Sequence, residues 1–211
     1  RLNGTLVGNG AAVDVDGDAV ADISNVILGF DPVYIGGSAG FALTMSTVDA
    51  DTDGNGTADL IGATLMGLAL DVTSAGVGIK DVAKLTVSGK LAIATLTPAG
   101  LAPTKSWFGL KMGDVTVSGG LDPDLIDLSA TITIGALDYN SATDTVAPAA
   151  AKRLDWASAF DLDGDGAFDD ALNPGADLPV AADLTIDFAS SLQLRLNGTL
   201  VGNGAAVDVD G

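Results

Sequence analysis

Apolar and polar residues alternate along much of this chain, which is the pattern of strands that bury one face. The longest such stretch is 183–200, where the even positions from Leu184 to Leu200 are mainly apolar. The stretches 84–95 and 125–138 alternate in the same way. In 84–95 the apolar face comprises Leu85, Val87, Leu91 and Ile93. We therefore predict an all-β fold: an elongated antiparallel β-sandwich or folded sheet with long strands.

Four segments modify this pattern. Residues 60–72 are apolar on both faces, which predicts the most buried strand. The alternation changes phase across 112–114, which predicts a β-bulge there. Gly119-Gly120 reads as a turn. Residues 148–156 begin with Pro and continue with an Ala run, so we expect one short helix there.

The two ends of the chain carry the same sequence. Residues 1–17 are identical to residues 195–211, an offset of 194 positions. The simplest explanation is a tandem array, so that 1–211 is one repeat module of period 194 followed by the start of the next copy. An engineered duplication is the alternative. We expect the identical ends to lie at opposite poles of an elongated module, with the join inside a strand.

Composition removes several classes of function. All 28 acidic residues are Asp, against nine Lys and Arg, so the net charge is −19, and there is no Cys or His. This charge repels nucleic acid, and without Cys there is no disulfide framework. We expect no enzyme, because imidazole, thiol and glutamate are missing as general bases. No uncharged apolar run reaches 18 residues, so we expect no membrane insertion.

Three nine-residue loops share the pattern D-x-D-G-[DN]-[GA]-x-[AF]-D. Loop one is 14–22, loop two is 51–59 and loop three is 161–169. Their candidate ligands are Asp14, Asp16, Asp18 and Asp22 in loop one; Asp51, Asp53, Asn55 and Asp59 in loop two; and Asp161, Asp163, Asp165 and Asp169 in loop three.

Side-chain oxygens at positions one, three, five and nine of a tight loop converge on one point. That many hard oxygen ligands suit Ca²⁺ better than Mg²⁺, which retains its water. Position six is Gly56 in loop two and Gly166 in loop three, which permits a sharp turn, whereas loop one has Ala19. The bidentate Glu at position twelve of EF-hand loops is absent, so these are not standard EF-hands.

Alternatives to this assignment remain open. Asp-Gly-rich stretches also form polar turns without metal. Asp49 offers loop two a different frame, in which Asp49 joins Asp51 and Asp53. In loop three Asp170 is an alternative to Asp169.

A large, acidic, Cys-free tandem repeat with D-x-D-G-D-G loops between alternating strands resembles the repeat regions of giant bacterial surface proteins, including RTX-type adhesins exported by type I secretion. The G-G-x-G-x-D nonapeptide of RTX β-rolls is absent, so the resemblance is to an extender module. The resemblance implies a calcium-stabilised stiff spacer on the bacterial cell surface, with neighbouring copies as head-to-tail partners and a distal ligand that the sequence does not identify. The alternatives are an apolar-groove module for lipid or another hydrophobic ligand, and a surface-layer or matrix component.

Overall fold

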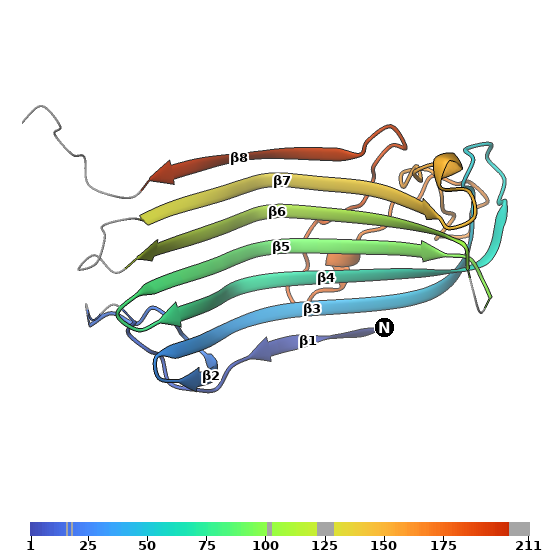
Figure 1. Ribbon diagram of the computed structural model, residues 1–211. Helices are drawn as coiled ribbons and strands as arrows, with labels where there is room; N and C mark the ends of the chain where they lie inside the picture. Colours follow the sequence, from blue (N-terminus) through green and yellow to red (C-terminus); the bar gives the residue numbers. More distant parts are fainter. Residues whose placement is uncertain (16, 18, 101–102, 122–128, 203–211) are drawn as a thin grey trace, which may run out of the picture.

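The computed structural model describes residues 1–15, 17, 19–100, 103–121 and 129–202. They form one eight-stranded sheet in the order β1-β3-β4-β5-β6-β7-β8, with β2 beside β3 (Figure 1). The strands are β1 (Leu2–Val7), β2 (Val26–Phe30), β3 (Val33–Ala50), β4 (Leu60–Ile79), β5 (Ala83–Thr97), β6 (Lys105–Leu121), β7 (Ser129–Asp144) and β8 (Leu194–Gly202). All neighbours pair antiparallel. The all-β prediction with long antiparallel strands is confirmed.

The central strands are the long ones that the alternation predicts. β4 has 20 residues and spans about 65 Å at roughly 3.3 Å per residue. The predicted strand 84–95 lies in β5, and the described part of 125–138 lies in β7, whereas 125–128 fall outside the described residues. The turn predicted at Gly119-Gly120 is wrong, because both glycines pair with β5 inside β6.

The second layer is not a second sheet but an irregular stretch, residues 151–193, which is called the covering segment below. It crosses one face of the sheet and lies behind the strands in Figure 1. The strand predicted over 183–200 is therefore wrong for 183–193. This part is extended, and its even positions Leu184, Ile186 and Phe188 are buried, but its backbone bonds to neighbouring irregular chain such as Leu172. Alternating burial thus arises here without a strand.

The covered face is lined by small residues, which bring the segment close to the sheet. Ala42, Ala69 and Ala92 lie side by side on β3, β4 and β5 and are fully buried. A Cβ atom on Gly109 of β6 would lie 3.1 Å from both Trp156 and Ile186. The core therefore consists of large side chains from 151–193 packed on a sheet face rich in Ala and Gly, to which Leu65, Leu96 and Trp107 also contribute.

Asn140 of β7 is a polar anchor beneath this segment. Its side-chain N–H groups donate to the carbonyl oxygens of Leu154 (2.9 Å) and Ala189 (3.3 Å). Its Oδ1 accepts from the indole Nε1 of Trp156 at 3.1 Å. Buried amides of this kind are costly to leave unpaired, so Asn140 fixes where the segment crosses the sheet.

The other face of the sheet carries large apolar side chains in rows that cross seven strands. Both rows consist wholly of apolar residues and glycine. One row is Leu2, Leu43, Leu68, Ile93, Leu110, Tyr139 and Leu194, and the next is Gly4, Phe41, Leu70, Leu91, Met112, Leu137 and Leu196. Leu2, Leu194 and Leu196 are each about 60 % exposed. No described segment of the chain covers these rows.

This arrangement bears on two expectations about burial. The apolar face of 84–95, with Leu91 and Ile93, is the uncovered one, and the buried side chains of β5 are Ala92, Ala94 and Leu96. The strand 60–72 was expected to be the most buried. It buries the alternate residues Ala63, Leu65, Gly67 and Ala69 on one face, while the residues between them are half-buried or exposed.

The helix expected near 148–156 is wrong, apart from a single 3₁₀ turn, η1 (Pro148–Ala150). Asp144, which ends β7, accepts the N–H groups of Val146 and Ala147, both at 2.9 Å. These two hydrogen bonds form a turn directly after β7. Beyond the turn the chain crosses the sheet without forming a helix, and the N–H of Trp156 donates to the carbonyl of Phe188. The other short helix is η2 (Pro174–Asp177).

Asp144 gives the fold a specific acid sensitivity. The N–H groups of Ala147 and Val146, and the charge of Lys105, outweigh desolvation and lower the pKa of its carboxyl from 3.8. A group with a depressed pKa stabilises the fold above the unfolded-state pKa, and this contribution is lost as the pH falls through the lower folded-state pKa. We expect the melting temperature to fall more steeply below pH 4 for the wild-type chain than for Asp144→Asn. Thermal unfolding between pH 5.5 and 2.5 measures this, and parallel curves for the two proteins would contradict it.

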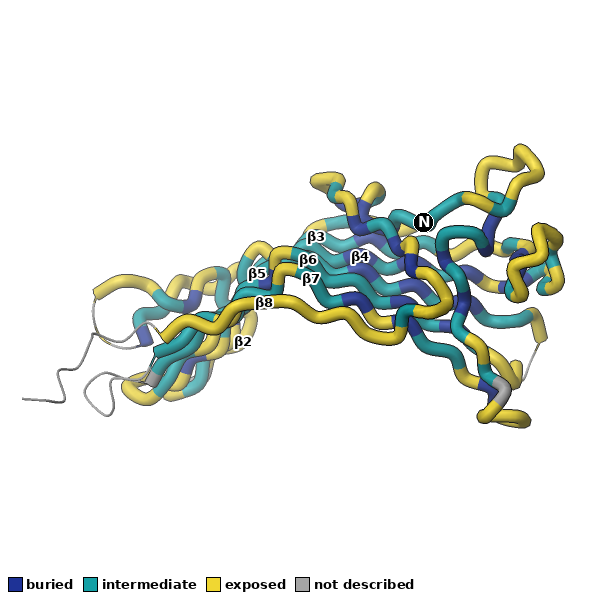
Figure 2. Tube along the Cα trace, turned by 90° about the horizontal axis from the view of Figure 1, so that it is seen from above, coloured by how far each residue is buried: buried dark blue, intermediate teal, exposed yellow. Residues whose placement is uncertain are grey.

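β-Bulges lie at one level across the sheet. The register shifts near Ser38 between β3 and β4, near Gly89 between β5 and β6, and near Gly135 between β7 and β8. The bulge predicted at 112–114 is confirmed within this line, because Asp114 and Val115 together oppose Gly89. Bulges bend strands and increase their twist, and the strands change direction part-way along their length (Figure 2).

Candidate metal-binding loops

Loops two and three lie side by side at one end of the sheet. Loop two connects β3 to β4, and loop three follows the part of the covering segment that contains Trp156. Ala50 and Phe160, which directly precede the two loops, form an antiparallel bridge, and the N–H of Asp51 donates to the carbonyl of Ala159 at 3.0 Å. The fold thus brings together two motifs that are about a hundred residues apart in the sequence.

Loop two folds around the carboxylate of Asp51. Its Oδ1 accepts the N–H of Gly54 at 2.7 Å, and its Oδ2 accepts the N–H of Gly56 at 2.6 Å. Asp59 closes the loop by accepting the N–H of Thr52 at 2.5 Å. Asp51, Asp53 and Asp59 each place one carboxylate oxygen within 4.8 Å of the other two. Asn55, the fourth predicted ligand, is exposed in this loop, and its N–H donates to Asp51 and Asp53.

The environment of Asp51 favours the ionised form. Desolvation raises the pKa of this buried carboxyl, but the N–H groups of Gly56, Gly54, Asn55 and Asp53 together lower it further, so the pKa lies below 3.8. A carboxylate held ionised by backbone N–H groups is ready to bind a cation without first losing a proton.

Loop three has the same hydrogen-bonding pattern as loop two, but it closes one residue later. Asp161 accepts the N–H groups of Gly164 (2.7 Å) and Gly166 (3.0 Å), as Asp51 does in loop two. The structure brings Asp170, rather than the predicted Asp169, to Asp161 and Asp163, again with oxygens within 4.8 Å of one another. Asp170 takes the place of Asp59 because its own N–H donates to Phe160, the residue before the loop, as Asp59 donates to Ala50.

The remaining predicted ligands of loop three lie on its exposed side. Asp165 accepts the N–H of Ala167 at 2.8 Å and is not part of the three-carboxylate cluster. Asp169 is exposed as well. The sequence contained the signal for Asp170, since an Asp-Asp pair ends the motif, but it did not show which of the two closes the loop.

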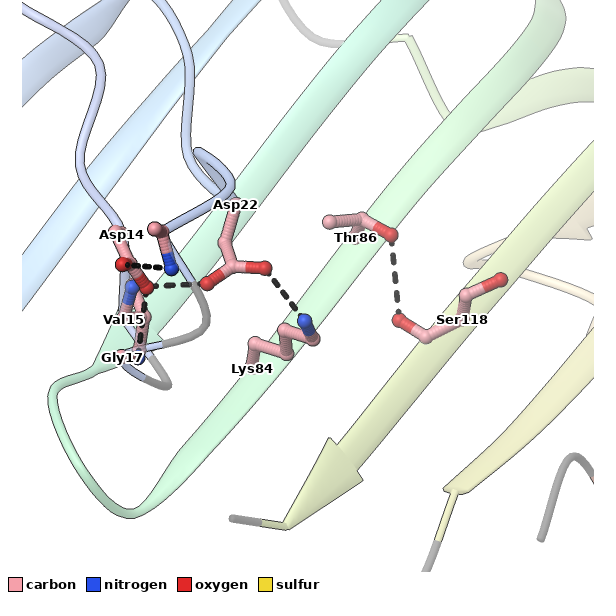
Figure 3. A network of polar contacts seen from close by, with 8 residues as sticks. Asp14, Val15, Gly17, Asp22, Lys84, Thr86 and Ser118 are labelled. Carbon is pink, nitrogen blue, oxygen red and sulfur yellow. Dashed lines mark hydrogen bonds and ion pairs between the residues drawn. The ribbon is translucent and has the colours of Figure 1, made fainter. Parts of the chain in front are cut away.

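Loop one lies at the other end of the sheet, beside the turn between β4 and β5 (Figure 3). Asp14 accepts the N–H groups of Gly17 and Ala19, as in the other loops. Asp22 accepts the N–H of Val15 at 2.8 Å, and its other oxygen lies 2.5 Å from the ammonium of Lys84. Asp16 and Asp18, the other two predicted ligands, lie outside the described residues.

Lys84 distinguishes loop one from the other two loops. The Asp22 side chain is only 7 % exposed, so its pairing with the Lys84 ammonium places a positive charge where a bound cation would otherwise balance the carboxylate. Ala19 also adopts a positive φ of 67° at position six, where Gly56 and Gly166 adopt the same conformation without the steric cost of a Cβ atom. The motif alone gave no sign of Lys84, which is 62 residues from Asp22.

Loops two and three fit a hard divalent cation. Each offers three carboxylates, and the ligands preferred by Ca²⁺ and Mg²⁺ are oxygens of this kind. Three carboxylates confined to so small a volume repel one another unless positive charge lies among them. These two clusters can therefore hold a metal ion.

Comparison with known proteins gives no relative: no protein-family model, curated protein or solved structure matches this chain. In the described parts of the chain there is no helix long and apolar enough to span a membrane.

Proposed function

We propose that this chain is a calcium-stabilised structural repeat that acts as a stiff extracellular spacer in a large bacterial surface protein of the RTX-adhesin type. The observation that carries the proposal is the identity of residues 1–17 and 195–211, which implies a tandem array of uniform domains. The long strands and the anchored covering segment support stiffness within each copy.

Calcium has a defined place in this proposal. Loops two and three, with Asp51, Asp53 and Asp59 and with Asp161, Asp163 and Asp170, tie the β3–β4 connection to the covering segment at one end of the sheet. A cation in each cluster would fix that end of the module. Because extracellular fluid is rich in Ca²⁺, the repeat would become rigid after export, which fits the type I secretion of the proteins it resembles.

Stiffness is tested by small-angle X-ray scattering on chains of four, eight and sixteen copies in Ca²⁺. A stiff array has no flexible linker between copies, so we expect the radius of gyration to rise almost in proportion to copy number once the array is much longer than a single strand. A rise close to the square root of copy number would indicate free hinges and would contradict a spacer function. The same series in EDTA measures how much of the stiffness depends on calcium.

A second function is favoured by the uncovered sheet face. Its two apolar rows cross seven strands, and a face of this kind suits a lipid or another hydrophobic ligand better than water. Titration of the chain with a fluorescent fatty acid, compared with Leu68→Asp on this face, tests it. Saturable binding that Leu68→Asp removes would support the alternative.

A further inference from the structure

The two identical segments form the two opposite edges of the sheet. Residues 2–7 form β1, which pairs with β3, and residues 196–201 lie in β8, which pairs with β7. In a tandem array of period 194, residues 195–202 of one copy are also residues 1–8 of the next copy. One strand then has to satisfy both sets of contacts, and four features of the structure show whether it can.

The first feature is direction. Six antiparallel pairings separate β1 from β8 along the sheet. An even number of reversals leaves β8 running in the same direction as β1, as Figure 1 shows. A single strand can therefore replace both without turning round.

The second feature is hydrogen bonding. The N–H of Gly8 donates to Gly37 of β3 at 3.1 Å, and in an antiparallel pair alternate residues face the same neighbour, so the even positions of β1 face β3. At the other edge the carbonyl of Gln193 accepts from Asn140 of β7 at 3.0 Å, so the odd positions of β8 face β7. The offset of 194 is even, and the two sets of backbone groups are therefore complementary.

The third feature is the orientation of the side chains. Leu2 lies in the uncovered apolar row that contains Leu43, and its equivalent Leu196 lies in the uncovered row that contains Leu137. On the covered face, Asn3 donates to the carbonyl of Asp177, and its equivalent Asn197 lies against Gly135. A shared strand would therefore continue both the uncovered and the covered face of the sheet from one copy to the next.

The fourth feature is one arginine with two acidic partners. Arg1 forms an ion pair with Asp177 at 2.5 Å, and its equivalent Arg195 pairs with the fully buried Asp138. In the array a single guanidinium would lie between Asp138 of one copy and Asp177 of the next. Its five N–H donors are enough for two carboxylates.

From these features we infer that β8 of each copy is β1 of the next, so that neighbouring copies share one strand and the whole array forms a single uninterrupted sheet. The partner of each edge is a second copy of this chain. The inference rests on the proposed tandem array and deepens it, because the array axis then runs across the strands instead of along them. Both edges of each internal copy are paired, which also removes the free edges through which sheets aggregate.

Spacing between copies tests the inference. Six strand intervals of about 4.8 Å give a repeat of about 30 Å, whereas copies stacked along the strands would be separated by about 65 Å. The chain has no Cys, so Val146→Cys in each copy of a two-copy protein places one spin label per copy at a site that is 77 % exposed. We expect a narrow distance distribution near 30 Å by double electron–electron resonance.

The outcomes separate this inference from the spacer function. A narrow peak near 65 Å overturns the shared strand while leaving a stiff spacer intact, and a broad distribution overturns both. Amide exchange gives a second measurement in protein labelled with ¹⁵N-leucine and ¹⁵N-threonine. Leu196 and Leu200 face the open edge in the 211-residue chain and should exchange at least a hundredfold more slowly in the first copy of the two-copy protein. The matched control, Thr199, faces β7 and should be protected in both proteins; unchanged rates at Leu196 and Leu200 would contradict the shared strand.

Discussion

Removing Ca²⁺ with EDTA is expected to lower the free energy of unfolding by about 5 kcal/mol when Ca²⁺ is initially present at a hundredfold excess over its dissociation constant. Each site that binds only the folded chain contributes about 2.7 kcal/mol under that condition, and loops two and three are the two sites proposed. Urea denaturation with and without EDTA measures the difference. Superimposed curves would show that neither cluster binds calcium.

Matched variants assign this effect to individual loops. Asp53→Asn and Asp163→Asn keep an oxygen that can accept the loop N–H bond but remove one charged ligand, so each should remove about half of the EDTA effect. Asp187→Asn is the control, because Asp187 is more than half exposed, outside the loops and paired only loosely with Lys111. Full recovery of stability by Mg²⁺ would leave a metal site but contradict the preference for calcium.

Trp156→Ala is expected to lower the free energy of unfolding by about 3–5 kcal/mol, since it empties the largest buried site beneath the covering segment. The indole contacts Phe160 at a centroid distance of 5.9 Å and donates to Asn140. Gly109→Ala should cost about 1–3 kcal/mol by pushing the same indole away from the sheet. Denaturant titration of each variant gives these values.

Met45→Ala is the matched control for the core. Met45 lies on the uncovered face and is 62 % exposed, so its loss should change stability by less than about 1 kcal/mol in a single copy. If Trp156→Ala and Met45→Ala had equal effects, the covering segment would not be part of the cooperative fold. A larger loss of stability in Trp156→Ala than in Met45→Ala would confirm that the core lies between the covering segment and the Ala- and Gly-rich face of the sheet.

Alternation predicted the strands well but not which face they bury. In β5 the large residues Leu91 and Ile93 read as the buried face, yet Ala92 and Ala94 are the buried ones, because the covering segment brings its own large side chains. Hydrophobicity measures how much a residue gains from burial, not whether another part of the chain is available to bury it. Only the tertiary structure supplies that second condition.

The same limit explains the segment 183–193. An extended chain that lies flat on a sheet buries every second side chain, so its pattern equals that of a strand. What differs is the destination of its backbone hydrogen bonds: the N–H of Ile186 donates to Leu172, and the N–H of Leu184 to the side chain of Asn173. Sequence periodicity contains no information about these partners.

The candidate metal-binding loops were predictable to the extent that they are local. The positions of Asp51 and Asp161 relative to the following glycines fix the N–H bonds that shape each loop, and all of these lie within five residues. The proximity of loops two and three, and the pairing of Asp22 with Lys84, depend on the path of the sheet. A local sequence motif contains no information about such long-range contacts.

In the tandem array proposed above, the line of bulges would determine which strand registers can form. A sheet made of similar alternating strands in identical copies offers many competing pairings, and a slip of two residues would keep every side chain on its own face. That slip would move Gly89 away from Asp114 and Val115, and it would misalign the extra residue Gly135 opposite β8. The bulges therefore allow only one pairing register for each pair of strands that contains one. Correct pairing in the proposed array would depend on these irregular positions, because the regular positions do not discriminate between right and wrong neighbouring strands.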